Sequence, residues 1–330
     1  MNKLIPAALL LAATGLTQAQ VTVYGLIDMS YGKNLADDAA TPTRKADFHS
    51  GGDDGNSQGN STTRFGLKGS TDVGSGVKGN FKLESNGITS GGAVNDPFFG
   101  RQAWGGFSGN FGEVRLGRQE SVPFQTMIDF DFNGAANMAS ALGNSLVAPW
   151  MAPRGRQDRS LQYIAPPIAG VKIHAGFQPE DKNNTTTKAN VAVGARYALG
   201  ALDLGATFET KRADLGKDFM AIAASYDLKV VKLMASYADS GTVNNTPGAS
   251  SGNGKGIGLG VVAPVAGFNI GAHIGKNTDS LNKITAIELF ANRQILKNTY
   301  AYLDIAHAEN KTPNPSIKAD GFALGVIYTF

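Results

Sequence analysis

The 330-residue sequence predicts an all-β fold, a 16-stranded antiparallel β-barrel that crosses a membrane. Three observations carry this prediction. Apolar and polar residues alternate with a period of two, the alternating runs are roughly ten residues long, and the connections between them are alternately short and long. Strands of soluble proteins are mostly ~5–6 residues long, whereas strands that cross a bilayer at a tilt need ~9–11 residues.

The N-terminal segment 1–19 is predicted to be a secretory signal peptide rather than part of the fold. Lys3 supplies a positive start, residues 4–16 are mostly apolar, and residues 17–19 (TQA) form a small-x-small cleavage site. The alternative is a buried helix. A membrane span is excluded, because the apolar stretch is shorter than the ~20 residues that a span needs. Residues 20–330 then form one barrel domain, because no shift in composition marks a second.

Charge and cysteine usage exclude several functional classes. Lys and Arg number 30 against 27 Asp and Glu, so the net charge of +3 is too balanced for a nucleic-acid-binding protein. The chain has no cysteine, which excludes disulfide scaffolds, thiolate zinc sites, iron–sulfur clusters and cysteine nucleophiles. No later stretch approaches ~18 uninterrupted apolar residues. The mature chain is therefore either a soluble exported protein or a β-barrel.

The alternation places the predicted strands. Phe81 and Leu83, for example, alternate with Lys82 and Glu84. The sixteen predicted strands cover residues 20–32, 61–71, 77–89, 98–108, 112–119, 157–166, 170–178, 189–199, 201–211, 218–228, 230–240, 254–264, 267–276, 284–295, 299–309 and 319–330.

The connections and the strand number decide which face of the sheet is inside. Short turns alternate with long polar loops such as 33–60 and 241–253, which is typical of an antiparallel meander. Closure is required, because an open sheet edge would leave backbone groups unpaired in hydrocarbon. A sixteen-stranded barrel is too wide to be filled by side chains. Its interior is therefore expected to hold water, and its apolar face to contact lipid.

Six short motifs carry a resemblance to a known family. They are residues 21–28 (VTVYGLID), 63–69 (TRFGLKG), 81–84 (FKLE), 100–104 (GRQAW), 116–119 (LGRQ) and 328–330 (YTF). In this order they resemble the general trimeric porins of β-proteobacteria, in the same family as the neisserial porins. The resemblance implies a homotrimer in the outer membrane of a Gram-negative bacterium. It also implies a water-filled channel through which small hydrophilic solutes and inorganic ions diffuse passively.

The C-terminal strand carries a second implication of this resemblance. Tyr328 and the terminal Phe330 share one parity with Phe322, Leu324 and Val326. In the family, such a strand looks like the signal read by the barrel-assembly machinery, which would be a protein partner beside outer-membrane lipid. The alternative is an ordinary final strand.

The longest segment without alternation, residues 120–153, is predicted to carry the function. Loops longer than ~12–15 residues are usually functional or disordered, and this one is too rich in Phe, Met and Leu for a disordered segment. Such a segment must be buried. In the porins that the sequence resembles, the third long loop folds into the barrel and narrows it. The alternative is an interface or surface loop.

Side-chain parity predicts a charged constriction. Arg64, Lys68, Lys82, Glu84 and Arg115 each oppose apolar neighbours and are expected to face the lumen. By the same parity Arg154 and Arg156 face inward, and we expect Asp129 and Asp131 to form an acidic patch on the long loop. The residues expected at the pore constriction are Arg64, Lys68, Lys82, Glu84, Arg101, Arg115, Asp129, Asp131, Arg154 and Arg156.

The resemblance adds roles and one conflict. Arg64, Glu84 and Arg101 match constriction positions of the family, and Arg156 matches the arginine that begins the strand after the third loop. Arg101, however, shares parity with Ala103, so it faces the lumen only if a bulge intervenes nearby. Basic residues outnumber Glu84 on the early strands, which predicts a weak to moderate anion preference that acids of the long loop could reverse.

Enzymatic functions lack the residues that they need. The four histidines are not at metal-ligand spacing, no Gly-x-Ser-x-Gly elbow joins a strand to a helix, and no glycine run ends as a phosphate loop does. We therefore expect no enzyme activity, no cofactor and no metal. Residues 53–56 (DDGN) offer oxygens for calcium without the EF-hand spacing, and a calcium site in this loop stays open as an alternative. Two alternatives stay open: a substrate-specific channel on the same fold, which needs an aromatic track or a selective basic ladder, and a soluble exported carbohydrate-binding protein.

Overall fold

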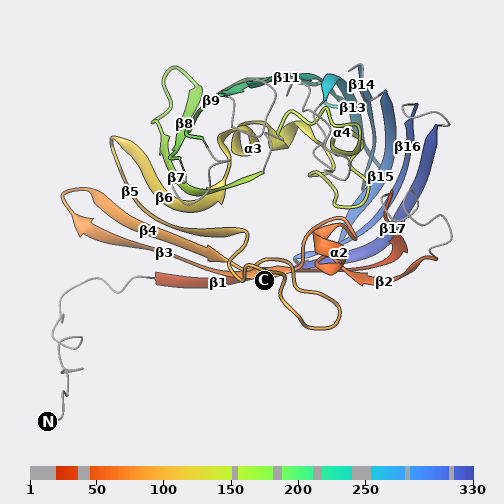
Figure 1. Ribbon diagram of the computed structural model, residues 1–330, viewed down its shortest axis with the longest axis horizontal. Helices are drawn as coiled ribbons and strands as arrows, with labels where there is room; N and C mark the ends of the chain where they lie inside the picture. The colour runs from red at the N-terminus through yellow and green to blue at the C-terminus, as the bar shows by residue number, and fades with distance from the viewer. Residues whose placement is uncertain are drawn as a thin grey trace, which may run out of the picture.

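A computed structural model of the chain describes residues 20–35, 45–150, 155–180, 188–210, 218–239, 254–278, 283–311 and 316–330. The predicted signal peptide and Arg154 lie outside these ranges. The described chain forms one antiparallel sheet of 17 strands that closes on itself (Figure 1). The strands are β1 (Gln20–Lys33), β2 (Asp47–Ser50), β3 (Arg64–Gly74), β4 (Val77–Glu84), β5 (Gln102–Gly109), β6 (Gly112–Glu120), β7 (Arg156–Ile164), β8 (Val171–Gln178), β9 (Asn190–Leu199), β10 (Leu202–Glu209), β11 (Phe219–Asp227), β12 (Lys232–Asp239), β13 (Lys255–Val265), β14 (Phe268–Asn277), β15 (Ile284–Leu296), β16 (Thr299–Asn310) and β17 (Ile317–Thr329).

The first and last long strands close the barrel. The C-terminal half of β1 pairs with β17, from Leu26 opposite Thr329 to Lys33 opposite Phe322. The N-terminal half of β1 pairs on its other edge with β3, from Gln20 opposite Ser70. Every other long strand pairs with its neighbours in sequence. The prediction of a closed antiparallel barrel of sixteen long strands is confirmed.

The short strand β2 was not predicted, because it lies in the connection 33–60. It pairs with β1 from Met29 opposite Ser50 to Gly32 opposite Asp47. Since β3 only begins at Arg64, this part of β1 would otherwise be an open edge, which β2 covers. Four residues are too few to give a periodic signal in the sequence.

The strands β4 and β5 are each shortened where they meet the segment that joins them, and this bears on Arg101. β4 ends at Glu84 rather than at residue 89, and β5 begins at Gln102 rather than at residue 98. The intervening segment 85–101 is irregular and carries glycine, asparagine and proline residues, which interrupt strands. Arg101 therefore precedes β5 instead of belonging to it.

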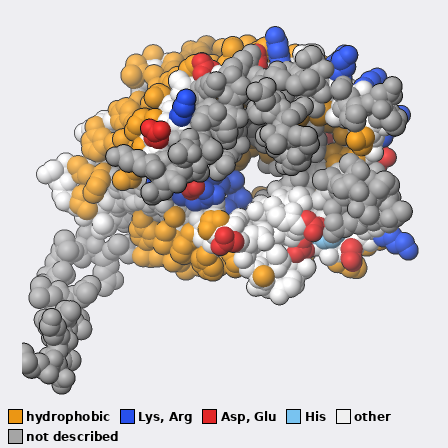
Figure 2. All heavy atoms as spheres, viewed as in Figure 1, with side chains coloured by type: hydrophobic (Ala, Val, Ile, Leu, Met, Phe, Trp, Pro, Cys, Tyr) orange, Lys and Arg blue, Asp and Glu red, His pale blue; other side chains and the backbone are white. Residues whose placement is uncertain are grey.

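The two faces of the wall differ as the alternation predicts. Along β11, Ile222 on the outer face is 52% exposed, whereas Ala221 and Ala223 on the inner face are 1% and 6% exposed. Large apolar side chains such as Leu259 and Ile287 are also exposed on the outside. Figure 2 shows hydrophobic side chains around the outer rim. Exposed apolar side chains along the outer face of the long strands are favourable only where lipid replaces water.

The segment between β6 and β7 packs against the inner face of this wall. It contains α3 (Val122–Met127), the 3-10 turn η2 (Ile128–Phe130) and α4 (Ala141–Asn144), and Figure 1 shows α3 and α4 within the ring of strands. We call residues 121–150 the inner segment. α3 contacts β8, β9 and β10, while α4 contacts β14, β15 and β16. None of the helices in the described ranges is long and apolar enough to cross a bilayer.

Local sequence explains how the inner segment folds and fits. The Ser121 hydroxyl accepts a hydrogen bond from the Phe124 N–H and caps α3, which also has a proline in its first turn. Met127, Phe130 and Leu142 are fully buried in one apolar cluster with inward residues of β11 and β12. Glycine in the wall makes room for them, because a Cβ atom at Gly205 would lie only 2.6 Å from the Phe130 ring.

Candidate functional site

Glu84 is the centre of a charge cluster on the inner face of β3 and β4. Its Oε1 atom lies 2.7 Å from Nε of Arg101 and 3.8 Å from Nε of Arg64, and its Oε2 atom lies 3.6 Å from Nζ of Lys82. The Tyr24 hydroxyl donates a hydrogen bond of 2.8 Å to Oε2. One carboxylate thus serves three cations, so the cluster keeps a positive excess.

Arg101 reaches this cluster without the bulge that its parity requires. Because β5 begins only at Gln102, the backbone at Arg101 is irregular and the alternation does not fix where its side chain points. The expectation that Arg101 faces the lumen only if a bulge intervenes was wrong, because it assumed that the strand includes residues 98–101. The Arg118 guanidinium donates to the Gly100 carbonyl at 2.6 Å and holds this turn.

Three cations, Lys68, Lys82 and Arg115, lie over aromatic rings. Nζ of Lys68 lies 5.3 Å and Nζ of Lys82 lies 5.5 Å from the Tyr24 ring centroid. The Arg115 guanidinium lies 4.5 Å from the Trp104 ring. Such contacts fix a cation in place without neutralising it.

Two further carboxylates partly balance these cations. Arg115 pairs with Glu113 at 2.7 Å, and Arg156 lies 3.6 Å from Glu120. Arg156 also stacks on Phe124 of the inner segment, 5.4 Å from its ring centroid. We define the basic wall as the six cations and three carboxylates brought together here, namely Arg64, Lys68, Lys82, Arg101, Arg115, Arg156, Glu84, Glu113 and Glu120.

The two aspartates of the inner segment lie in different places. Asp129 pairs with Arg196 of β9, and its side chain is 62% exposed. Asp131 is 3% exposed, so the expectation that it faces the lumen was wrong. Its carboxylate accepts hydrogen bonds from the Asn133 N–H and the Ser140 hydroxyl, and its Oδ1 atom lies 3.7 Å from Nδ1 of His273 on β14.

Asp131 belongs to a set of buried acids that the sequence analysis missed. Asn133 Nδ2 donates to Glu288 at 2.7 Å and to Asp304 at 2.9 Å, and Asn60 Nδ2 donates to Asp304 at 2.9 Å. The Tyr302 hydroxyl donates to Asp28 at 2.6 Å. We call these acids and amides the buried carboxylate network; it comprises Asp28, Asp131, Glu288, Asp304, Asn60 and Asn133.

This network fastens the inner segment to β1, β15 and β16. The four acids are at most 3% exposed, and the hydrogen bonds given above come from amides, hydroxyls and a backbone N–H group. The alternation in the sequence indicates that Asp28, Glu288 and Asp304 point inward. It cannot identify the residues that cover them, because those residues lie far away in the sequence.

Comparison with known proteins places the chain in a family. The sequence model described as Gram-negative porin matches residues 7–313. The chain belongs to the Gram-negative porin family. It is 28% identical to outer membrane porin protein 32 of Delftia acidovorans over 98% of this chain and 95% of that protein. It is 30% identical to an outer membrane porin protein of Bordetella pertussis over 71% of this chain and 68% of that protein.

The fold agrees with this assignment. The anion-selective porin from Comamonas acidovorans superimposes with a TM-score of 0.70 at 22% identity, covering 95% of this chain and all of that one. The predicted family resemblance is confirmed. This porin is an outer-membrane channel for small solutes and ions, and it is not an enzyme.

One cluster in the porin has the composition of a metal site. Ligand atoms of Asp131, His273 and Glu288 lie within 4.8 Å of one another, all buried. However, His273 Nε2 accepts the Phe132 N–H at 3.2 Å, which leaves the ring proton on Nδ1, facing Glu288 at 3.3 Å. A metal would need the Nδ1 lone pair, so this arrangement does not fit one.

Burial and the neighbouring Glu288 carboxylate raise the pKa of Asp131 to about 6.

The remaining sequence-predicted residues lie at the barrel seam. Tyr328 and Phe330 are exposed on the outer face and stack with ring centroids 6.1 Å apart. The Phe330 backbone exchanges hydrogen bonds of 3.0 and 3.1 Å with Gly25 of β1. The terminal residue therefore takes part in closing the barrel, and its role as an assembly signal stays a prediction.

Proposed function

We propose that this porin is a general diffusion channel with a weak to moderate preference for anions. The observation that carries the proposal is the distribution of charge inside the barrel. The basic wall holds six cations against three carboxylates, as defined above. The acids of the opposite wall are buried beneath the inner segment, where Glu288 and Asp304 are 0% exposed.

The physical consequence is a field of one dominant sign. Fixed cations beside a narrow aqueous path lower the free energy of a passing anion and raise that of a cation. Glu84, within reach of three cations, keeps the preference moderate, and the exposed Asp129 weakens it further. Figure 2 shows Lys and Arg side chains at the edge of the central opening. The similarity to a porin named anion-selective agrees with this sign.

The test is a comparison of variants in planar bilayers under a KCl gradient. Arg101→Gln and Arg156→Gln should each move the reversal potential toward the potassium equilibrium value, and the double variant should move it further. Arg293→Gln is the matched control, because Arg293 stacks on Phe268 of the outer face, 5.2 Å from its ring, and should leave the potential unchanged. Equal potentials in all variants would remove the basic wall as the selective element.

We further propose three properties of export and assembly. The segment 1–19 is a signal peptide cleaved before Gln20, which the positive start, the apolar stretch and the small-x-small site at residues 17–19 support. The mature porin is a homotrimer, as the family resemblance implies, and its C-terminal strand binds the barrel-assembly machinery through Tyr328 and Phe330. The exposure of this aromatic pair on the outer face supports the last point.

Each of these properties has its own measurement. N-terminal sequencing of the protein isolated from outer membranes should begin at Gln20. Chemical cross-linking in membranes should give a trimer, and a monomer alone would contradict that proposal. Removal of Phe330 should reduce the amount of folded protein in the outer membrane, whereas unchanged assembly would argue for an ordinary final strand.

A further inference from the structure

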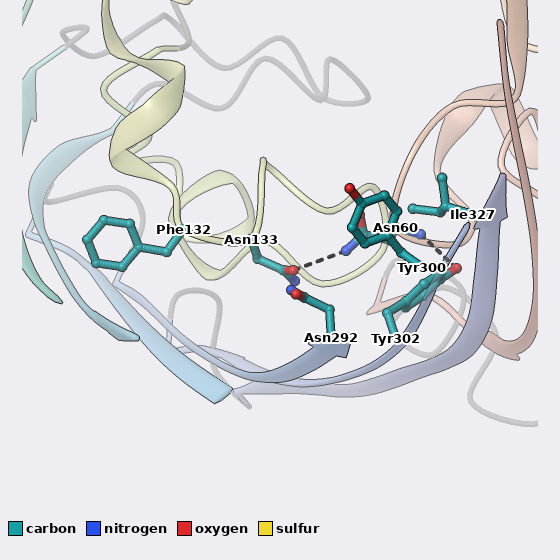
Figure 3. A pocket seen from close by; sticks show the side chains of 7 residues that line it. All are labelled: Asn60, Phe132, Asn133, Asn292, Tyr300, Tyr302 and Ile327. Carbon is teal, nitrogen blue, oxygen red and sulfur yellow. Dashed lines mark hydrogen bonds between the residues drawn. The ribbon is translucent and has the colours of Figure 1, made fainter. Parts of the chain in front are cut away.

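A second feature of the lumen lies on the wall opposite the basic wall. A cavity of about 240 Å³ opens between the inner segment and the inner face of β15, β16 and β17. Aromatic rings, amides and the aliphatic side chain of Ile327 line it, and none of these described residues is charged (Figure 3). The lining residues used below are Phe132, Tyr300, Tyr302, Asn60, Asn133 and Asn292.

Part of this lining is held rigidly. Asn60 Nδ2 donates to Asn133 Oδ1 at 3.1 Å, and the Asn60 N–H donates to the Tyr302 hydroxyl at 3.1 Å (Figure 3). Tyr302 in turn donates to Asp28. Because these groups satisfy one another through the buried carboxylate network, they form a fixed floor and do not need to reorganise when a solute binds.

Other polar groups of the lining are left for a solute. Asn292 Oδ1 accepts from Asn269 Nδ2 at 3.0 Å, but Asn292 Nδ2 has no partner within the described ranges. The Tyr300 hydroxyl also has none there, and this side chain is 41% exposed. One face of Phe132 is already occupied by Lys232, whose Nζ lies 4.9 Å from the ring centroid. Tyr300 is therefore the ring offered to the lumen.

The combination of ring and amide selects a class of solute. A sugar ring presents a face of C–H groups, which packs on an aromatic ring, and an edge of hydroxyls, which both donate and accept hydrogen bonds. Asn292 supplies a donor, and the Tyr300 hydroxyl supplies a donor and an acceptor. Drug-sized ligands occupy pockets of ~300–1,000 Å³, so this smaller cavity has room for one ring.

The lining of the cavity offers an ion no partner of opposite charge. None of the described residues that line it is charged, so an ion would lose hydration there without gaining an ion pair. The nearby carboxylates of Asp28 and Asp304 are covered by hydrogen bonds from Tyr302 and from the Asn60 and Asn133 amides. We propose that this cavity is a weak subsite for a neutral monosaccharide-sized polyol within the channel. The inference rests on the proposed diffusion channel and gives it a second class of solute.

The test is the effect of D-glucose on the KCl current through single channels in a planar bilayer. A subsite predicts that the current falls with glucose concentration along a saturating curve. Tyr300→Ala removes the stacking ring and should raise the half-blocking concentration by roughly tenfold, as expected for loss of one stacked aromatic contact. Asn292→Leu removes the amide donor and should also weaken the block, while Tyr300→Phe should weaken it less than Tyr300→Ala.

Asn80→Leu is the matched control. Asn80 faces the lumen from β4 on the opposite side and bridges Ser70 and Ser108, so this change should leave the glucose block as in the unmodified protein. All variants are first compared for single-channel KCl conductance, which shows that they fold and insert.

A current that falls linearly with glucose, as viscosity alone requires, overturns the subsite while the channel stands. Saturation that neither Tyr300→Ala nor Asn292→Leu alters overturns its location. Absence of conductance in the unmodified protein contradicts the channel itself and, with it, the subsite.

Discussion

The two sides of the lumen hold similar numbers of carboxylates but present them in opposite ways. On the basic wall, Glu84, Glu113 and Glu120 lie among six cations, and each is within ion-pair distance of at least one of them. On the other side, the acids of the buried carboxylate network lie beneath the inner segment and are bonded by neutral groups. The net charge of +3 gives no hint of this division.

The difference shows that burial, rather than composition, sets the field in this channel. A carboxylate covered by Asn133 and α4 contributes little to a solute in the lumen, whereas its hydrogen bonds fasten the inner segment. The acids on one side therefore stabilise the position of the inner segment, whereas the cations on the other side act on passing ions. Substitutions on one side at a time can therefore separate the two roles.

The largest effect is expected from Asn133→Leu, which keeps the approximate volume but removes the donors to Glu288 and Asp304. Each buried acceptor left unsatisfied costs ~1–3 kcal/mol, so the variant should be several kcal/mol less stable. Thermal unfolding in detergent, followed by circular dichroism, measures this. Asn80→Leu on the basic side is the control and should change the midpoint much less. Equal midpoints in the two variants would mean that the network does not fasten the segment.

A pH effect on the same network should be the next in size. Because burial raises the pKa of Asp131 to about 6, the folded protein binds more protons than the unfolded chain between the ordinary carboxyl pKa and this value. Stability should therefore fall as the pH rises through that window and then level off. Glu288 and His273 are the titratable groups that face Asp131.

Asp131→Asn separates this group from all others. The midpoint of thermal unfolding of the unmodified protein should drop between acidic and neutral pH, and the drop should be smaller in the variant. A stability that rises with pH in both proteins by the same amount would contradict the assignment.

On the basic wall, Glu84→Gln should increase the anion preference. It removes the carboxylate shared by Arg64, Arg101 and Lys82 while keeping an oxygen that accepts hydrogen bonds. Exposed ion pairs are worth ~0.2–1 kcal/mol, and Glu84, which is only 3% exposed, belongs at the upper end of this range, so the ratio of chloride to potassium permeability should rise by roughly fivefold. The reversal potential under a KCl gradient gives this ratio, and a fall in the ratio would contradict the arrangement.

The smallest change is expected from Asp129→Asn. Asp129 is exposed and paired with Arg196, which also pairs with Asp203. Its loss should shift the reversal potential slightly toward the chloride value and leave thermal stability nearly unchanged. A shift as large as that of Glu84→Gln would mean that the inner segment, rather than the basic wall, controls selectivity.

The sequence predicted those parts of the molecule that follow a period. Alternation placed the sixteen long strands and turned Lys68, Lys82 and Glu84 inward, because each strand residue faces one side or the other. It could not place β2, which is too short, or Arg101, which lies in an irregular turn. Asp131 was misplaced because the inner segment has no period to follow. Asn133 and Glu288, 155 residues apart, meet only through closure of the barrel.

The reversal potential of the unmodified porin, in a planar bilayer separating unequal KCl solutions, tests the charge distribution of the lumen most directly. Because the lumen exposes the basic wall while the opposing acids stay buried, we expect stepwise conductance with a reversal potential displaced toward the chloride equilibrium value. A potential displaced toward the potassium value would contradict this distribution, because the buried acids would then govern the field in the pore.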